Sequence, residues 1–214
     1  MATVVSSTYP GRIQCAWEPQ MPIKNGDALP SAVRTCEVLD AQGNGHIVHN
    51  LIDGRPSLLL FIRHFGCIGC SENVGVLAPR FHELAQLHTQ VILIGCGPAL
   101  FIDGFRERHN LLHAPAQVFT DPSLSSHQAA GLRYGIMGGF SPKAIWEMGR
   151  AFVNGHTSDR TQGDIRQHAG ALMIDGDGVV RLYHRNTTLG DHANGQSIVD
   201  AALSIWLKAN PDIA

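Results

Sequence analysis

Two cysteines three positions apart follow directly on an apolar run. Cys67 and Cys70 come after Leu58 to Ile62, which reads as a buried strand, and residues 71–87 read as a helix. Cys67 is therefore expected at the strand-to-helix turn, where unpaired N–H groups and the helix dipole favour an anion. This position predicts a lowered pKa and a reactive thiolate at Cys67. Cys70, one turn further on, can close a short disulfide with it.

Two other interpretations of the cysteine pair stay open. The pair could bind zinc, but a structural zinc site needs four ligands. The nearest candidates, His46, His49 and Cys96, are scattered in the sequence, so we expect no metal. The two thiols could also be inert and buried.

Length and composition limit the number of domains and the kinds of partner that the chain can have. The chain has 214 residues, of which 44% are hydrophobic and 16% are charged, which fits one well-packed domain. We expect an irregular arm over residues 1–32 and a single domain over residues 33–214. A net charge of -2 without a run of Lys or Arg argues against a nucleic-acid partner.

The sequence also indicates a cellular compartment. No stretch approaches the ~20 apolar residues that span a bilayer, and the first residues do not read as a secretory leader, so no membrane association and a cytoplasmic location are expected. Cys15, Cys36 and Cys96 show no framework spacing. A reducing compartment with one reactive pair fits better than a disulfide scaffold.

Further elements are predicted along the chain. Two short strands around a turn form an expected hairpin, and later apolar runs predict two more buried strands, a second hairpin and a closing helix. The first hairpin is expected over 34–39 and 46–51, and the two buried strands over 91–95 and 117–121. The second hairpin is expected over 171–174 and 179–183, and the closing helix over 196–208. Short helices are expected up to residue 109 and over 124–134, and 135–167 reads as an inserted segment with a helical piece. Pro79 lies inside the helix 71–87 and should bend rather than break it.

This element order predicts an α/β fold, in which helices flank a mixed β-sheet. With the Cys-x-x-Cys after its first central strand, it resembles the thioredoxin fold. More narrowly, it resembles the peroxiredoxin-like AhpC/TSA antioxidant enzymes, in which a strand ending in Arg-His-Phe runs into the cysteine motif. Those residues are Arg63, His64 and Phe65 here. The segments 183–185 and 190–193 also resemble that branch. The resemblance implies a thioredoxin-like sheet with an N-terminal β-hairpin and an inserted helical segment.

The chain also departs from related families. Peroxiredoxins usually carry Pro-x-x-x-Thr-x-x-Cys around the attacking thiol, and neither Pro nor Thr matches here. They carry an arginine where this chain has Ala169, and thioredoxins carry a cis-proline in the same place. These departures argue against assigning rapid peroxide turnover or general disulfide exchange.

Several basic residues are candidates for the site. Arg63 could lower the pKa of Cys67 and orient an oxygen, or it could reach solvent from the strand end. His64 could donate a proton to a leaving group, although any one of the 12 histidines could simply pack or lie at the surface. The resemblance adds Arg166, Arg185 and His192 as substrate-binding residues, with ordinary surface charge as the alternative.

The expected function is that of a thiol-dependent oxidoreductase without a cofactor. Cys67 would attack a peroxide or another small oxidised organic substrate, and Cys70 would resolve the product as a disulfide. An external thiol reductant, of the thioredoxin or glutathione type, would reset the pair. A specialised redox enzyme of a biosynthetic pathway and a redox-sensing binding protein without turnover remain alternatives. A homodimer is compatible with the sequence, which does not fix the oligomeric state.

Overall fold

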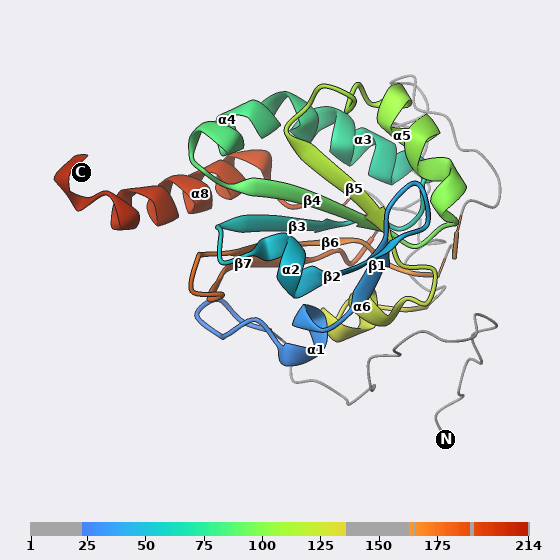
Figure 1. Cartoon of the computed structure of the whole chain (residues 1–214), viewed down its shortest axis with the longest axis horizontal. Helices are drawn as coiled ribbons and strands as arrows, with labels where there is room; N and C mark the ends of the chain where they lie inside the picture. Colours follow the sequence, from blue (N-terminus) through green and yellow to red (C-terminus); the bar gives the residue numbers. More distant parts are fainter. Residues whose placement is uncertain (1–22, 136–162, 165, 189–190, 214) are drawn as a thin grey trace.

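The computed structural model describes residues 23–135, 163–164, 166–188 and 191–213. Its strands form one seven-stranded sheet in the order β2-β1-β5-β4-β3-β6-β7 (Figure 1). The strands are β1 Glu37–Leu39, β2 Gly45–Ile47, β3 Ser57–Phe61, β4 Gln90–Gly95, β5 Ala116–Thr120, β6 Gly170–Ile174 and β7 Val180–Arg185.

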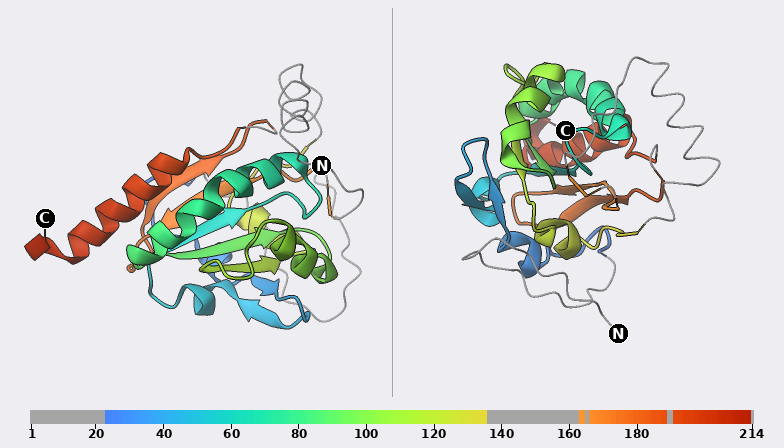
Figure 2. Two further views of the ribbon diagram at one scale, coloured as in Figure 1. Left: turned by 90° about the horizontal axis from the view of Figure 1, so that it is seen from above. Right: turned by 90° about the vertical axis from the view of Figure 1, so that its right-hand side faces the viewer.

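Helices cover both faces of this sheet, as Figure 2 shows. The helices α3, α4, α5 and α8 lie on one face, and the short helices α1, α2 and α6 lie on the other. Their bounds are α1 Ser31–Arg34, α2 Val48–Ile52, α3 Ile68–Leu77, α4 Phe81–Gln86, α5 Ile102–Arg108, α6 Ser125–Ala129 and α8 Gly195–Ala209, with 3₁₀ turns η1 Ala78–Arg80, η2 Ala99–Phe101 and η3 Pro211–Ile213.

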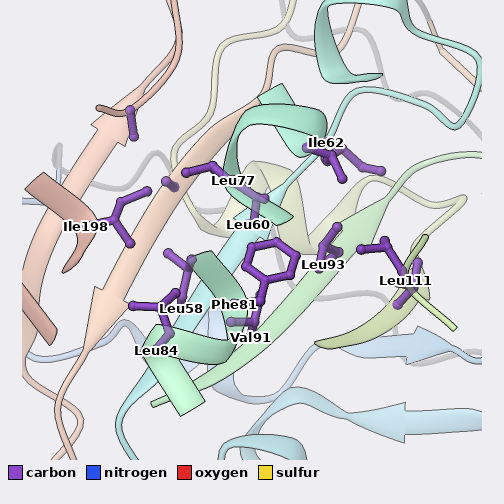
Figure 3. Close-up of a cluster of buried hydrophobic side chains, with 14 of the residues drawn as sticks. Leu58, Leu60, Ile62, Leu77, Phe81, Leu84, Val91, Leu93, Leu111 and Ile198 are labelled. Carbon is purple, nitrogen blue, oxygen red and sulfur yellow. The ribbon is translucent and has the colours of Figure 1, made fainter. Parts of the chain in front are cut away.

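Strand β3 lies in the middle of the sheet and is buried along its whole length. Leu58 and Leu60 belong to the hydrophobic cluster under α3 and α4, where Figure 3 shows them with Phe81. Leu59 and Phe61 alternate with them and join the cluster on the opposite face. A strand buried on both faces needs an apolar side chain at every position, which explains the unbroken run at 58–62.

The pairing of the strands confirms a mixed sheet. β3 pairs in parallel with β4, and β4 pairs in parallel with β5, whereas β6 runs antiparallel to β3. The closing hairpin of β6 and β7 is confirmed, with register shifts between Met173 and Ile174. The fold predicted from the element order is therefore correct.

The hairpin expected over 34–39 and 46–51 is shorter than predicted. Its strands pair only from Glu37 to Leu39 and from Gly45 to Ile47. Residues 31–34 and 48–52 form the helices α1 and α2 instead. These helices are four and five residues long, so they carry too few turns to show a helical period in the sequence.

The helix expected over 124–134 is also shorter, because it spans only Ser125–Ala129. Leu124 before it and Gly131 after it both have positive φ angles, 65° and 67°. Such left-handed residues interrupt a helix, so they limit α6 to a single turn.

The long helix predicted over 71–87 begins earlier and bends at Pro79. Helix α3 starts at Ile68 and ends at Leu77, a 3₁₀ turn follows, and α4 starts at Phe81. The chain keeps its helical direction through the turn because both caps of η1 retain helical dihedrals. Pro79 therefore lies in a 3₁₀ turn that separates the predicted helix into α3 and α4.

Residues 23–30 pack against the β6–β7 hairpin. The N–H groups of Gly26 and Leu29 donate to Val180 and Gly178, at 2.7 Å and 2.8 Å. Ile23 and Leu29 are buried. Cys36 is disulfide-bonded, which the spacing of the cysteines did not predict. Most of the insertion expected at 135–167 lies outside the described residues, and so do residues 1–22 of the expected arm.

Candidate active site around Cys67 and Cys70

Cys67 is the N-cap residue of α3. Its φ and ψ angles, -79° and 120°, are extended rather than helical, as is usual for a residue at the start of a helix. The Cys67 N–H donates to the His64 carbonyl at 3.0 Å, and the Cys67 carbonyl accepts the N–H of Ser71 at 2.9 Å. The sulfur of Cys67 accepts the backbone N–H of Cys70 at 3.4 Å. The sulfur therefore takes the place of a capping oxygen.

The same contacts favour the Cys67 thiolate. A hydrogen bond from the Cys70 side chain is the largest effect and lowers the pKa of Cys67 to about 6, with the charge of Arg63 and two backbone N–H groups acting in the same direction. Burial alone would raise this pKa. Hydrogen bonds and a nearby cation outweigh the cost of burying the anion here.

The pKa of Cys70 shifts in the opposite direction. Burial and the neighbouring Cys67 sulfur raise the pKa of Cys70 well above the usual value of a thiol. Its sulfur accepts the backbone N–H of Arg63 at 3.2 Å. At neutral pH the pair therefore consists of one thiolate and one thiol that donates to it.

Both sulfurs are covered in this reduced state. Cys67 is 4% exposed and Cys70 is 2% exposed, and both are free thiols. A large substrate can contact Cys67 only after the surrounding chain has moved, whereas a small oxidant needs a much smaller opening.

The loop before Cys67 is held by contacts from two elements, β4 and α5. The Phe65 ring lies against Gly95 of β4, where an added Cβ would meet it at 2.8 Å. The ring also packs against Phe105 of α5 at 5.3 Å between centroids. Arg108, at the end of α5, donates to the Phe65 carbonyl at 3.3 Å. These contacts fix the approach of the chain to the helix start.

Arg63 and His64 lie between β3 and the cysteine pair. The charge of Arg63 acts on Cys67, Cys70 and His64. His64 is 6% exposed, and burial, followed by the charge of Arg63, lowers its pKa to about 4. Its Nδ1 is buried with no hydrogen-bond partner in the described part of the chain. His64 is therefore a neutral imidazole at neutral pH.

A third cysteine adjoins this loop. The thiol of Cys96, which follows β4, donates to the Arg63 carbonyl, and it lies 3.9 Å from the Asp164 carbonyl. Burial raises the pKa of Cys96 to about 12, so it stays a thiol. Gly163 passes directly over the loop, because a Cβ on it would meet His64 Cβ at 2.6 Å and Cys96 Sγ at 3.1 Å.

Arg166, Arg185 and His192 make polar contacts with residues other than Cys67 and Cys70. Arg166 binds Asp164 through two hydrogen bonds, at 3.1 Å and 3.2 Å, and lies over the Tyr134 ring. Arg185 donates to the Gly131 carbonyl at 3.4 Å. His192 pairs with the buried Asn186 at 3.1 Å between Nδ1 and Nδ2.

Sequence reasoning missed three residues that contact the cysteine loop. Arg108, Gly163 and His127 were not singled out, although His127 Nε2 lies 3.0 Å from the carbonyl of Ile62 at the end of β3. No spacing signal could have identified them, because they contact the loop from positions 43 or more residues away.

The described ranges contain neither a metal-binding cluster nor a membrane-spanning helix. No group of three or more His, Cys, Asp or Glu side chains there could hold a metal ion. Within the same ranges, no helix has the length and apolar character needed to cross a membrane.

Comparisons with known proteins identify the family of the chain. A family model described as AhpC/TSA antioxidant enzyme matches residues 76–188, which is just over half of the chain. Human peroxiredoxin-like 2C is 28% identical over 188 residues, covering 82% of this chain and 80% of its own length. A chloroplastic thioredoxin-like protein AAED1 from Arabidopsis thaliana is 27% identical over 134 residues, covering 63% of this chain and 53% of its own length.

Solved structures show the same fold. Reduced Prx3 from Vibrio vulnificus in complex with H₂O₂ has a TM-score of 0.58 at 18% identity, covering 84% of this chain and 99% of that one. Peroxiredoxin 5 from Alvinella pompejana has a TM-score of 0.60 at 14% identity, covering 86% and 99%. The matched family model, the relatives and the thioredoxin-like sheet agree, and the chain belongs to the AhpC/TSA antioxidant enzymes, a peroxiredoxin-like family of thiol-dependent oxidoreductases.

Proposed function

We propose that this protein reduces peroxides through Cys67 and Cys70. The Cys67 thiolate attacks the terminal oxygen of the peroxide, the O–O bond breaks, and Cys67 becomes a sulfenic acid while the leaving alkoxide or hydroxide takes up a proton. The Cys70 thiol then forms a disulfide with Cys67 and releases water. Two electrons from an external thiol reductant restore both thiols.

One observation carries the proposal, namely the opposite pKa shifts of two hydrogen-bonded thiols at a helix start. A peroxidatic thiol must be ionised near neutral pH, and a resolving thiol must stay protonated until the sulfenic acid has formed. The family description as antioxidant enzymes and the hydrogen peroxide bound to Vibrio Prx3 support a peroxide as the oxidant.

Arg63 and His64 are assigned supporting roles. The guanidinium of Arg63 stabilises the Cys67 thiolate, because its charge lowers the pKa of that thiol. His64 is neutral at pH 7 because its pKa is low, and its ring N–H donates a hydrogen bond to the leaving group. For Arg166, Arg185 and His192, a direct substrate contact rests on the family resemblance alone.

Intact-mass analysis after one equivalent of hydrogen peroxide tests this function. The wild type should lose two mass units as the disulfide forms, and a thiol reductant should restore the original mass over repeated cycles. Cys70→Ser should gain about 16 mass units as a trapped sulfenic acid, and Cys67→Ser should not react. The matched variant Cys96→Ser should behave as the wild type.

The same measurement separates turnover from sensing. A protein that oxidises once but does not consume further peroxide with reductant present would be a redox sensor. Preferred alkylation of Cys70 over Cys67 at neutral pH would reverse the assignment of the two thiols.

A further inference from the structure

A groove of about 700 Å³ lies beside the helix that carries the cysteine pair. One wall is formed by α3, η1 and α4, and the other by the end of α5 and the loop after it. Its lining includes Ser71, Gly75, His82, Arg108, His109 and His113.

The lining of this groove, called here the α3–α5 groove, carries one sign of charge. Arg108 supplies a permanent positive charge, and three histidines add to it when protonated. No residue that lines the groove within the described chain is acidic. Glu72 and Glu107 are close in sequence but are not among the lining residues. Such a concave basic site attracts anionic ligands.

A buried polar atom gives a second indication of a ligand. Ser71 is 2% exposed, and its Oγ has no hydrogen-bond partner in the described part of the chain. A buried hydroxyl without a partner costs free energy, so a ligand atom that hydrogen-bonds to it from the groove is favoured.

The groove lies beside the part of α3 that follows the redox pair, and neither Cys67 nor Cys70 lines it. Cys67, Ser71 and Gly75 are spaced four residues apart, so they follow one face of α3. Ser71 donates its N–H to the Cys67 carbonyl, and Arg108 on the other wall donates to the Phe65 carbonyl. A ligand in the groove therefore lies along the helix face that begins at Cys67.

We propose that the α3–α5 groove binds the carboxylates of an acidic thiol, meaning a small thiol that carries carboxylate groups, and that this thiol is the reductant. The inference rests on the proposed function, because the thiol must meet a disulfide between Cys67 and Cys70. Its thiolate attacks one sulfur of that disulfide and releases the other as a thiolate. A second acidic thiol then displaces the first, so two small thiols lose two electrons as their own disulfide, and two protons return to the protein.

Calorimetric titration with S-methylglutathione tests binding without redox chemistry. This probe keeps both carboxylates of glutathione but cannot react with a disulfide. Arg108→Gln should weaken its binding about tenfold, as expected for one charge-assisted hydrogen bond. His113→Gln, which leaves the Phe65 contact of Arg108 intact, should weaken it by a smaller factor. Arg106→Gln is the matched control, because Arg106 lies on the same helix but pairs with Asp103 outside the groove.

Reduction of the oxidised protein gives an independent readout. The wild type should be reduced faster by glutathione than by 2-mercaptoethanol at equal thiolate concentration. Arg108→Gln and His113→Gln should both lose this preference, measured as the ratio of the glutathione rate to the 2-mercaptoethanol rate. The ratio is the readout because Arg108→Gln also removes the hydrogen bond to the Phe65 carbonyl and can change both rates, whereas His113→Gln keeps that hydrogen bond. A general distortion of the loop would slow both thiols equally and would overturn the inference.

The outcomes separate this inference from the function on which it rests. If peroxide produces no Cys67–Cys70 disulfide, the proposed function fails, and the binding of S-methylglutathione still reports on the groove. If the disulfide forms and recycles but the wild type and both groove variants bind S-methylglutathione equally, the groove inference fails alone. Binding of inorganic phosphate in place of S-methylglutathione would also overturn it.

Discussion

Cys67 and Cys70 share a hydrogen bond, yet their pKa values move in opposite directions. The Cys67 thiolate accepts from both the side chain and the backbone of Cys70, whereas Cys70 is left with the cost of burial and a negative neighbour. Burial alone would raise the pKa of both thiols. The hydrogen bond that the Cys70 side chain donates to Cys67 makes the two pKa values unequal, and the charge of Arg63 and the backbone N–H groups at the helix start lower the pKa of Cys67 further.

The effect of each contact on the pKa of Cys67 can be measured with single variants. Cys70→Ala removes the strongest hydrogen bond to the thiolate, so the pKa of Cys67 should rise by about 1 to 2 units. Arg63→Met removes a charge but keeps the backbone N–H, and the rise should be smaller. Rates of iodoacetamide alkylation as a function of pH give both values. A larger rise in Arg63→Met than in Cys70→Ala would contradict the order of effects, and an unchanged profile would remove Arg63 from the site.

His64 links the site to acid stability. Its pKa falls from 6.5 to about 4 on folding, so between these values the unfolded chain binds more protons than the folded protein. Stability should therefore decrease as the pH falls from about 6.5 to about 4, and His64 accounts for about 3 kcal/mol of that loss.

Urea denaturation at pH 7 and at pH 4 measures this effect. In His64→Leu the difference in unfolding free energy between the two pH values should shrink, whatever the absolute stability of the variant. The exposed His88 provides the control, since His88→Asn should keep the wild-type difference. An equal pH dependence in His64→Leu and wild type would mean that His64 is not buried as a neutral ring.

The spacing of Cys67 and Cys70 and the apolar run before them were enough to predict that these thiols lie at the start of a helix after a buried strand. The contacts around them could not be predicted in the same way. Cys96 contacts the Arg63 carbonyl, and Arg108 contacts the Phe65 carbonyl, from 33 and 43 residues away. Only the pairing of β3 with β4 and the packing of α5 bring these residues to the loop.

At the level of elements, the long apolar runs predicted the sheet well, and the short helices were missed. The central strands β3 and β4 carry unbroken apolar runs after their first residues, Ser57 and Gln90, which leaves a clear signal in the sequence. Helices α1 and α2 have four and five residues, and tertiary packing of Val33 and Val48 decides their conformation. Local propensity alone does not specify such short segments.

Helix α8 offers a test of an individual element. Its N-cap Asn194 accepts the N–H groups of Gln196 and Ser197 at 2.8 Å and 3.2 Å. Asn194→Ala should destabilise the protein by about 1 kcal/mol, and Asn194→Asp should retain most of the stability. Thermal unfolding followed by circular dichroism measures both. The alkylation rate of Cys67 should not change, because α8 starts outside the cysteine loop.

For the whole molecule, the two hydrophobic clusters on either side of the sheet determine the stability. Leu60 is 1% exposed in the cluster under α3 and α4, where Figure 3 shows it near Phe81. Leu60→Ala should therefore lower the free energy of unfolding by about 2 to 5 kcal/mol in urea denaturation. Leu203, 40% exposed on α8, is the matched control, and Leu203→Ala should cost much less. Equal losses would show that the core is not centred on β3.

Because Cys67 is also the N-cap residue of α3, its redox state affects the stability of the first turn of this helix. A thiolate is a strong acceptor for the Cys70 N–H, whereas a disulfide sulfur carries no charge and accepts weakly. Oxidation would therefore leave the first turn of α3 poorly capped, at a cost of about 1 kcal/mol. That difference favours the reduced protein and makes its disulfide a stronger oxidant by about 20 mV. The backbone at the start of α3 would then exchange its amide hydrogens faster in the oxidised protein, and each turn of the proposed cycle would loosen and re-form the start of this helix.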